Sequence, residues 1–247
     1  MMMGRSLSAL YAFFVSIASS STTVVALVAQ SNNNVLIKVC HHKDCVKRGG
    51  GERLLNTFRD LMGKSSCVTL ESSGCLSQCG KGPNVFVIDS DGKEKLYFSV
   101  DDPTTASAVL DVATSQEYPI NFLVAATSII EAERSNSVTK KESILSSVIS
   151  LAEGDPILEN SFVHARALYL RADSRLSHNV DGAIEDAKSA AEIAPTVGKV
   201  WRVLANAHEA NGDLDGAINA LREWASVDAT FTMKSKTEIE RLSCLLK

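Results

Sequence analysis

Two closely spaced pairs of cysteines constrain this chain most. Cys40 and Cys45 form a C-x4-C pair, and Cys75 and Cys79 form a C-x3-C pair that begins thirty residues after Cys45. Each pair follows a run of residues that predicts a β-strand, so each short loop can aim two thiolates at one metal ion. Two such loops side by side can hold a two-iron cluster. The spacing therefore predicts a metal centre bound by these four cysteines.

The composition is that of an ordinary globular protein. The chain has 247 residues, of which 45% are hydrophobic and 22% charged, enough for about two domains. Its formal net charge of -4 and the lack of a long Lys/Arg run in the sequence argue against nucleic acid as a partner. The sequence shows neither a nucleophile paired with a base nor a phosphate-binding G-x-x-x-x-G-K loop. These features favour an electron carrier or adaptor over an enzyme.

Residues 1–34 are typical of a targeting leader. The segment has one basic residue, Arg5, and no acidic residue, with apolar stretches at Leu7–Ala18 and Val24–Ala29 separated by five Ser and Thr residues. Cleavage between Ala18 and Ser31 is favoured over an uncleaved membrane anchor, because the five hydroxyl residues lower the apolarity of residues 7–29. Metal-binding thiolates fit poorly with secretion, so a plastid (chloroplast) transit peptide is the prediction, with the mitochondrion as the alternative. No membrane contact is expected after cleavage.

Residues 35–115 predict a compact α/β domain. Short β-branched runs predict strands at Val35–Val39, Cys67–Leu70, Val85–Ile88 and Lys95–Val100. Apolar residues at helical spacing predict helices over Glu52–Met62, with Gly63 as a left-handed cap, and over Thr104–Ala113. The sequence Asp89-Ser90-Asp91-Gly92 is typical of a hairpin turn. The order strand, helix, strand, loop, hairpin, helix indicates a thioredoxin-like fold with a cysteine loop after each of the first two strands.

Residues 119–247 predict an all-α domain. The run Val180-Asp181-Gly182-Ala183-Ile184 recurs as Leu214-Asp215-Gly216-Ala217-Ile218, an offset of 34 residues, and resembles the tetratricopeptide (TPR) repeat. The clearest copies span residues 164–195 and 197–229, although Trp224 stands where the repeat usually has a small residue. Further helices are expected at Ile120–Arg134, Lys140–Glu153 and, as a terminal cap, Glu238–Leu246.

The cysteine loops resemble those of the thioredoxin-like 2Fe-2S ferredoxins, a family also seen as a cluster module of respiratory complex I. The resemblance rests on Cys40-His41-His42-Lys43-Asp44-Cys45 and on Gly74-Cys75-Leu76-Ser77-Gln78-Cys79-Gly80-Lys81-Gly82-Pro83-Asn84, and it covers about residues 35–113. It implies that Cys40, Cys45, Cys75 and Cys79 ligate one 2Fe-2S cluster, with each pair serving one iron. Gly80 and Gly82 can take positive φ and bring backbone N–H groups near the cluster sulfurs.

Zinc is the main alternative to iron, because it also accepts four thiolates at such spacings. The sequence favours the iron-sulfur cluster, since the spacing and the Gly-Cys-Leu context agree, and it places a disulfide framework third. Cys67 and Cys244 are expected to be buried apolar residues. His41 and His42 are expected to be exposed loop residues, because four thiolates already complete the ligand set.

Two functions follow from these expectations. In the first, the cluster serves electron transfer or redox sensing, a redox partner meets the cluster face, and the TPR repeats dock a protein partner. In the second, the repeats form a scaffold or assembly factor, and an iron-sulfur or zinc site only stabilises the N-terminal domain.

Overall fold

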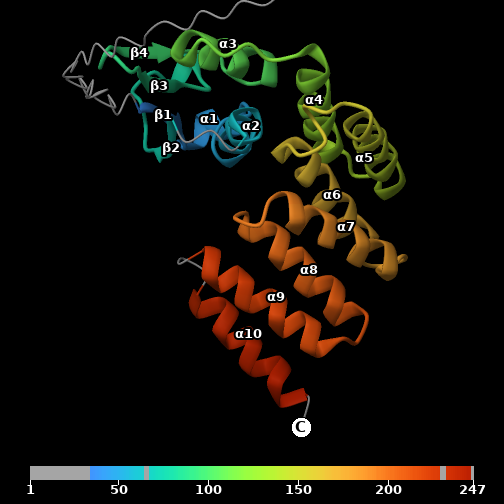
Figure 1. Cartoon of the computed structure of the whole chain (residues 1–247). Helices are drawn as coiled ribbons and strands as arrows, with labels where there is room; N and C mark the ends of the chain where they lie inside the picture. The colour runs from blue at the N-terminus through green and yellow to red at the C-terminus, as the bar shows by residue number, and fades with distance from the viewer. Residues whose placement is uncertain (1–33, 64–66, 229–231, 246–247) are drawn as a thin grey trace, which may run out of the picture. The chain divides into compact units, whose positions relative to one another are not determined.

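The structure, a computed structural model, describes residues 34–63, 67–228 and 232–245. A four-stranded mixed sheet with its helices is followed by a run of packed helices (Figure 1). The predicted fold class, an α/β part followed by an all-α part, is therefore confirmed. The predicted leader lies outside the described residues except for Asn34. Within the described ranges, no helix is both long and apolar enough to cross a membrane.

The sheet brings the two cysteine loops to one end. Its strand order is β2-β1-β3-β4, and the strands are β1 (Val35–Cys40), β2 (Val68–Ser73), β3 (Val85–Ile88) and β4 (Glu94–Tyr97). Strands β1 and β2 are parallel, and β3 is antiparallel to both β1 and β4. Because Cys40 pairs in register with Ser73, β1 and β2 end side by side, and the loops that follow them start as neighbours.

The alternation of side chains along β1 explains its packing. Val35, Ile37 and Val39 are buried, whereas Lys38 lies on the other face and pairs with Glu71 of β2 at 3.6 Å. The buried face packs against α2 (Glu52–Met62) and α3 (Pro103–Thr114), which contact each other and contribute the fully buried Phe58 and Leu110. The sheet is thus covered on one face by these two helices.

Several elements near the loops differ from the expected ones. A short helix, α1 (Lys43–Lys47), lies inside the first cysteine loop and was not predicted. Strand β4 ends at Tyr97 rather than Val100, because Ser99 takes a positive φ of 54° and turns the chain. The hairpin at Asp89 forms as expected, with Gly92 at φ 79°. Gly63 also has a positive φ, 59°, but its ψ of -133° is not that of a left-handed cap.

The helical region consists of packed neighbours that follow one another along the chain. Its helices are α4 (Ile120–Arg134), α5 (Val138–Glu153), α6 (Phe162–Arg175), α7 (Val180–Ile193), α8 (Gly198–Ala210), α9 (Leu214–Val227) and α10 (Thr232–Leu245). Helices α6 and α7 form one hairpin and α8 and α9 another, and they coincide with the two predicted copies. Helix α10 begins six residues before the predicted start.

The second helix of each hairpin begins with the same local chemistry. Asn179 accepts a hydrogen bond from the backbone N–H of Gly182 at 3.1 Å, and Asp213 does the same for Gly216 at 2.9 Å. A Cβ at either glycine would overlap the capping side chain, at 2.6 Å in the first case and 2.3 Å in the second. A capping side chain and the glycine that leaves room for it therefore recur 34 residues apart.

Helix α2 of the sheet region also contacts the helical region through a buried ion pair. The Arg166 side chain on α6 is 3% exposed; its guanidinium donates to Asp60 of α2 and, at 2.8 Å, to Glu133 of α4. Burial raises the pKa of the Asp60 carboxyl to about 6, although Arg166 acts in the opposite direction. A cation between two carboxylates thus joins three helices that are distant in sequence.

Candidate metal centre

The first cysteine loop holds two buried thiols. Cys40 ends β1 and Cys45 lies inside α1, and both are fully buried free cysteines. The backbone fixes both: Cys40 N–H donates to the carbonyl of Asn84 at 3.1 Å, and the carbonyl of Cys45 accepts from the N–H of Gly50 at 2.8 Å. The fold of α1 therefore turns the second cysteine of the pair back toward the first.

The second loop presents its thiols nearer the surface. Cys75 is exposed and Cys79 is half-buried at the start of a short 3-10 helix, Cys79–Lys81. The two sulfur atoms lie 3.3 Å apart. Between them Ser77 takes a positive φ of 64° and points its N–H at the Cys75 sulfur, 3.4 Å away. The residue with positive φ in this loop is thus Ser77, whereas Gly80 and Gly82 are not in that region.

Hydrogen bonds tie the two loops together. The Arg48 guanidinium of the first loop donates to the carbonyl of Gly80 in the second at 3.0 Å. His41 N–H donates to the carbonyl of Ser73 at 2.8 Å, where the two parallel strands end. These contacts hold both pairs of thiols in one region of the sheet end.

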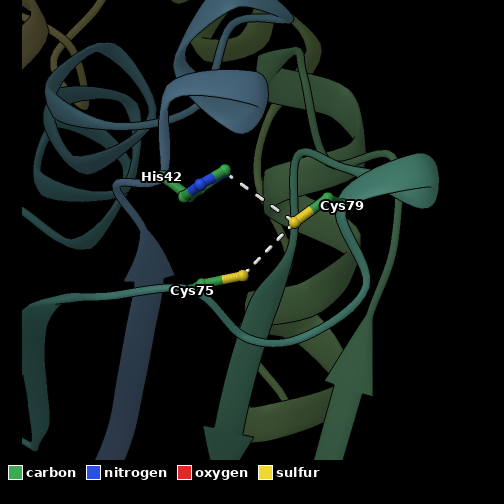
Figure 2. Close-up of side chains that lie close together, drawn as sticks. All are labelled: His42, Cys75 and Cys79. Carbon is green, nitrogen blue, oxygen red and sulfur yellow. Dashed lines mark hydrogen bonds between the residues drawn. The ribbon is translucent and has the colours of Figure 1, made fainter.

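Three donor atoms meet at the surface of this region. The His42 Nδ1 and the sulfur atoms of Cys75 and Cys79 all lie within 4.8 Å of one another, and the His42 Nδ1 is 3.7 Å from the Cys79 sulfur (Figure 2). His42 was expected to be an exposed loop residue, but its imidazole is half-buried and points into this group. His42 stands two residues after Cys40, at the N-cap of helix α1, which was not predicted. This position was the feature of the sequence that could have indicated its role.

Cys40 and Cys45 lie outside that group of three but next to it. They hydrogen-bond to each other, and the charges of Cys40 and Cys79 both act on Cys45. Burial, followed by the hydrogen bond to Cys40, raises the pKa of the Cys45 thiol to about 11. The hydrogen bond to Cys75 raises the pKa of Cys79. All four predicted cysteines therefore interact, and their neighbours favour the neutral thiol form of Cys45 and Cys79.

The surroundings of Cys45 leave no room for another side chain. A Cβ at Gly82 would lie 2.6 Å from the Cys45 sulfur, and the backbone N–H of Asn84 donates to that sulfur. Asn84 is 1% exposed and its Oδ1 is buried without a hydrogen-bond partner, while its Nδ2 donates to the carbonyl of Gln78 at 2.9 Å.

Thiols and an imidazole are the donors that zinc and iron-sulfur centres use, so the donor set fits a bound metal.

Two other cysteines do not behave as expected. Cys67 precedes β2, an edge strand with little burial on either face, and is exposed rather than buried. Cys244 lies near the end of α10, where Leu242 faces the core and Cys244 does not. Neither cysteine joins the candidate metal centre.

A comparison with models of known protein families found no match to this chain, and a search of curated proteins found no similar sequence.

Proposed function

We propose that this chain is a 2Fe-2S protein that serves electron transfer or redox sensing. In this proposal the sheet region is a thioredoxin-like ferredoxin domain and the helical region is a TPR-like domain that docks a protein partner. One observation carries it: both predicted cysteine pairs emerge from the same end of the sheet, on loops joined by the bond from Arg48 to Gly80. The proposed ligands are Cys40, Cys45, Cys75 and Cys79.

The residues around these ligands suit that role. When bound, a 2Fe-2S cluster would supply reversible one-electron chemistry. The N–H groups of Asn84 and Ser77 point at the sulfur atoms of Cys45 and Cys75, which stabilises negative charge on each thiolate. The side of the centre formed by Cys75 and Cys79 is the exposed one, so a redox partner would approach there. Burial of Cys40 and Cys45 would protect the other side from water.

A second function has its own supporting observation. The donor atoms of His42, Cys75 and Cys79 lie within 4.8 Å of one another, close enough to share one ion, and Cys40 and Cys45 are not part of this group. Zinc bound there would leave a TPR scaffold or assembly factor with a structural metal. This alternative predicts a different set of essential residues.

Three variants of the full-length chain separate the two functions. The protein is purified without oxygen, and iron, sulfide and zinc are assayed together with the absorption and EPR spectra of the reduced sample. The cluster predicts two irons and two sulfides per chain, lost in both Cys45→Ser and Cys79→Ser and retained in His42→Ala. Zinc that is lost in His42→Ala and Cys79→Ser but retained in Cys45→Ser would contradict the redox function. It would support the second function, a scaffold with a structural metal.

We propose that the chain acts in a plastid, with the mitochondrion as the alternative, on the basis of the leader sequence alone. A fluorescent protein fused behind residues 1–34 tests this by its location and by cleavage of the leader. Retention of an uncleaved leader in a membrane would favour the anchored alternative.

A further inference from the structure

A cavity unrelated to the cysteine loops lies between α2 and the helical region. Its volume is about 540 Å³, within the usual range for small-molecule sites. Its wall is formed by α2, α6, the start of α8 and the end of α9, and we call it the α2–α8 cavity. Neither the proposed metal centre nor the repeat pattern accounts for it.

The buried cation of the cavity wall, Arg166, is paired with two carboxylates. Arg166 forms part of the wall, and its two terminal nitrogens donate to Asp60 and Glu133. The Nε of Arg166 is buried and has no hydrogen-bond partner among the described residues. This Nε has less than 1 Å² of accessible surface, so a ligand in the cavity does not reach it, and Arg166 acts as a paired part of the wall.

Helix α8 adds positive potential at the same wall. Lys199 and Arg202 lie three residues apart, on one face of the helix. Lys199 pairs with Glu52 at 3.2 Å, whereas Arg202 forms no ion pair within the described part of the chain. Helix α8 also begins at this wall without a side-chain cap on its first N–H groups, which favours an anion there.

The rest of the wall is mixed. Its carboxylates Glu52 and Asp60 are paired with Lys199 and Arg166, and Asp228 lies next to Gly198 at the start of α8. Trp224 and Tyr169 line the cavity and are 5% and 8% exposed. Trp224, the bulky residue in place of the usual small one, is accommodated by Gly198, where a Cβ would lie 2.8 Å from the indole Cδ1. The unusual tryptophan is therefore matched by a glycine across the hairpin, and its ring helps to form the cavity wall.

We propose that the α2–α8 cavity binds a small organic anion, a molecule with one carboxylate or similar head group on a flat apolar body. Arg202, the cation of the wall without an ion pair among the described residues, and the start of α8 hold the head group, and Trp224 and Tyr169 contact the body. A small molecule is favoured over a peptide crossing the groove, because α2 closes the cavity through the buried pair of Asp60 and Arg166. The site is independent of the metal.

Two fluorescent probes test the proposal on the full-length chain. The first is 1-anilinonaphthalene-8-sulfonate, and the second is N-phenyl-1-naphthylamine, which has the same aromatic body without the anionic group. We expect one sulfonate probe per chain, with energy transfer from tryptophan because Trp224 lines the cavity. Removal of the unpaired cation by Arg202→Gln is expected to weaken sulfonate binding about tenfold, or about 1.4 kcal/mol, and to leave the neutral probe unchanged.

The matched control is Arg222→Gln, because Arg222 is exposed on α9 and does not line the cavity, and its one side-chain bond among the described residues is to Asn219 of its own helix. Both substitutions are at exposed positions, so the fold is expected to persist, and circular dichroism checks it. Equal sulfonate affinity in Arg202→Gln and Arg222→Gln, or equal affinity of the two probes for the unaltered chain, would overturn the proposal. The proposal would also be overturned if an acidic hexapeptide displaced the sulfonate probe at a lower concentration than 2-naphthoate does, because the site would then favour a peptide over a small molecule.

Discussion

Gly82 leaves the space that the sulfur of Cys45 occupies. A Cβ at position 82 would lie 2.6 Å from that sulfur, closer than nonbonded carbon and sulfur atoms can approach. The φ of Gly82 is -70°, which any residue can adopt, so the backbone does not require glycine here. The position of the Cys45 side chain is therefore the reason for this glycine.

Gly82→Ala is expected to displace the Cys45 sulfur and to lower the metal content per chain several-fold. The matched control is Gly80→Ala, because a Cβ at Gly80 would meet no atom within 4 Å. Metal and sulfide assays of the two purified variants make the comparison. Equal loading of the two would show that Cys45 is not held in place for a metal.

The contact from Arg48 to Gly80 predicts an effect on how long the metal is retained. Arg48→Gln removes a charged hydrogen bond between the loops, worth about 0.5–1.5 kcal/mol at an exposed position, so metal loss to a chelator should be about 2–10 times faster. Lys47→Gln, one residue away in the same exposed segment, removes a charge without this bond and is expected to leave the rate unchanged. The absorbance of the centre, followed over time with chelator, measures both.

The buried guanidinium of Arg166 predicts a large loss of stability when it is removed. Arg166→Met leaves the Asp60 carboxyl buried without its cation, and the free energy of unfolding at pH 7 should fall by about 3–5 kcal/mol. Urea denaturation measures this change against Arg222→Met, which should shift stability by less than about 0.5 kcal/mol. A double variant, Asp60→Leu with Arg166→Met, should recover much of the loss. A loss below about 1 kcal/mol for Arg166→Met would contradict the buried position of this pair.

The raised pKa of Asp60 predicts a particular pH dependence. Between its ordinary value of 3.8 and the folded value of about 6, the folded protein keeps a proton that the unfolded chain has released. The contribution of Asp60 to stability is therefore fully present below pH 3.8 and is lost as the pH rises through about 6. The full difference is about 3 kcal/mol, two pKa units at about 1.4 kcal/mol each.

Asp60→Asn is the reference that isolates this effect, because the variant has an amide of the same size that does not titrate at this position. The difference between the free energies of unfolding of the unaltered chain and of the variant should decrease as the pH rises from 4 to 7. Urea denaturation across this range provides the measurement, and a constant difference would show that the pKa of Asp60 is not raised.

Much of the fold could be predicted because it depends on local patterns. The helices at Glu52–Met62 and Ile120–Arg134 and the strand at Val85–Ile88 have the predicted bounds, since apolar periodicity and flanking turns define them. The repeated run starting at Val180 and again at Leu214 located both second helices, because each begins with its own cap.

The parts that sequence could not predict depend on distant contacts. Asp60 and Arg166 are 106 residues apart, and no local pattern indicates that they pair. The position of His42 depends on helix α1, which is only five residues long and has no clear periodicity. The left-handed residue in the second loop is Ser77 rather than a glycine, because the position of the Cys75 sulfur, not intrinsic preference, determines that turn.

The caps at Asn179 and Asp213 act over three residues, whereas β1 pairs with partners 33 and 46 residues away, as in Val35 with Val68 and Val39 with Val85. Short-range contacts form sooner than long-range ones, so we expect the two hairpins to become ordered during folding before the sheet closes. The thiols of the two loops then meet only in the last stage, so the proposed metal would bind after the sheet has formed. Pulse-labelled hydrogen exchange would show this order as protection of α6 to α9 ahead of β1.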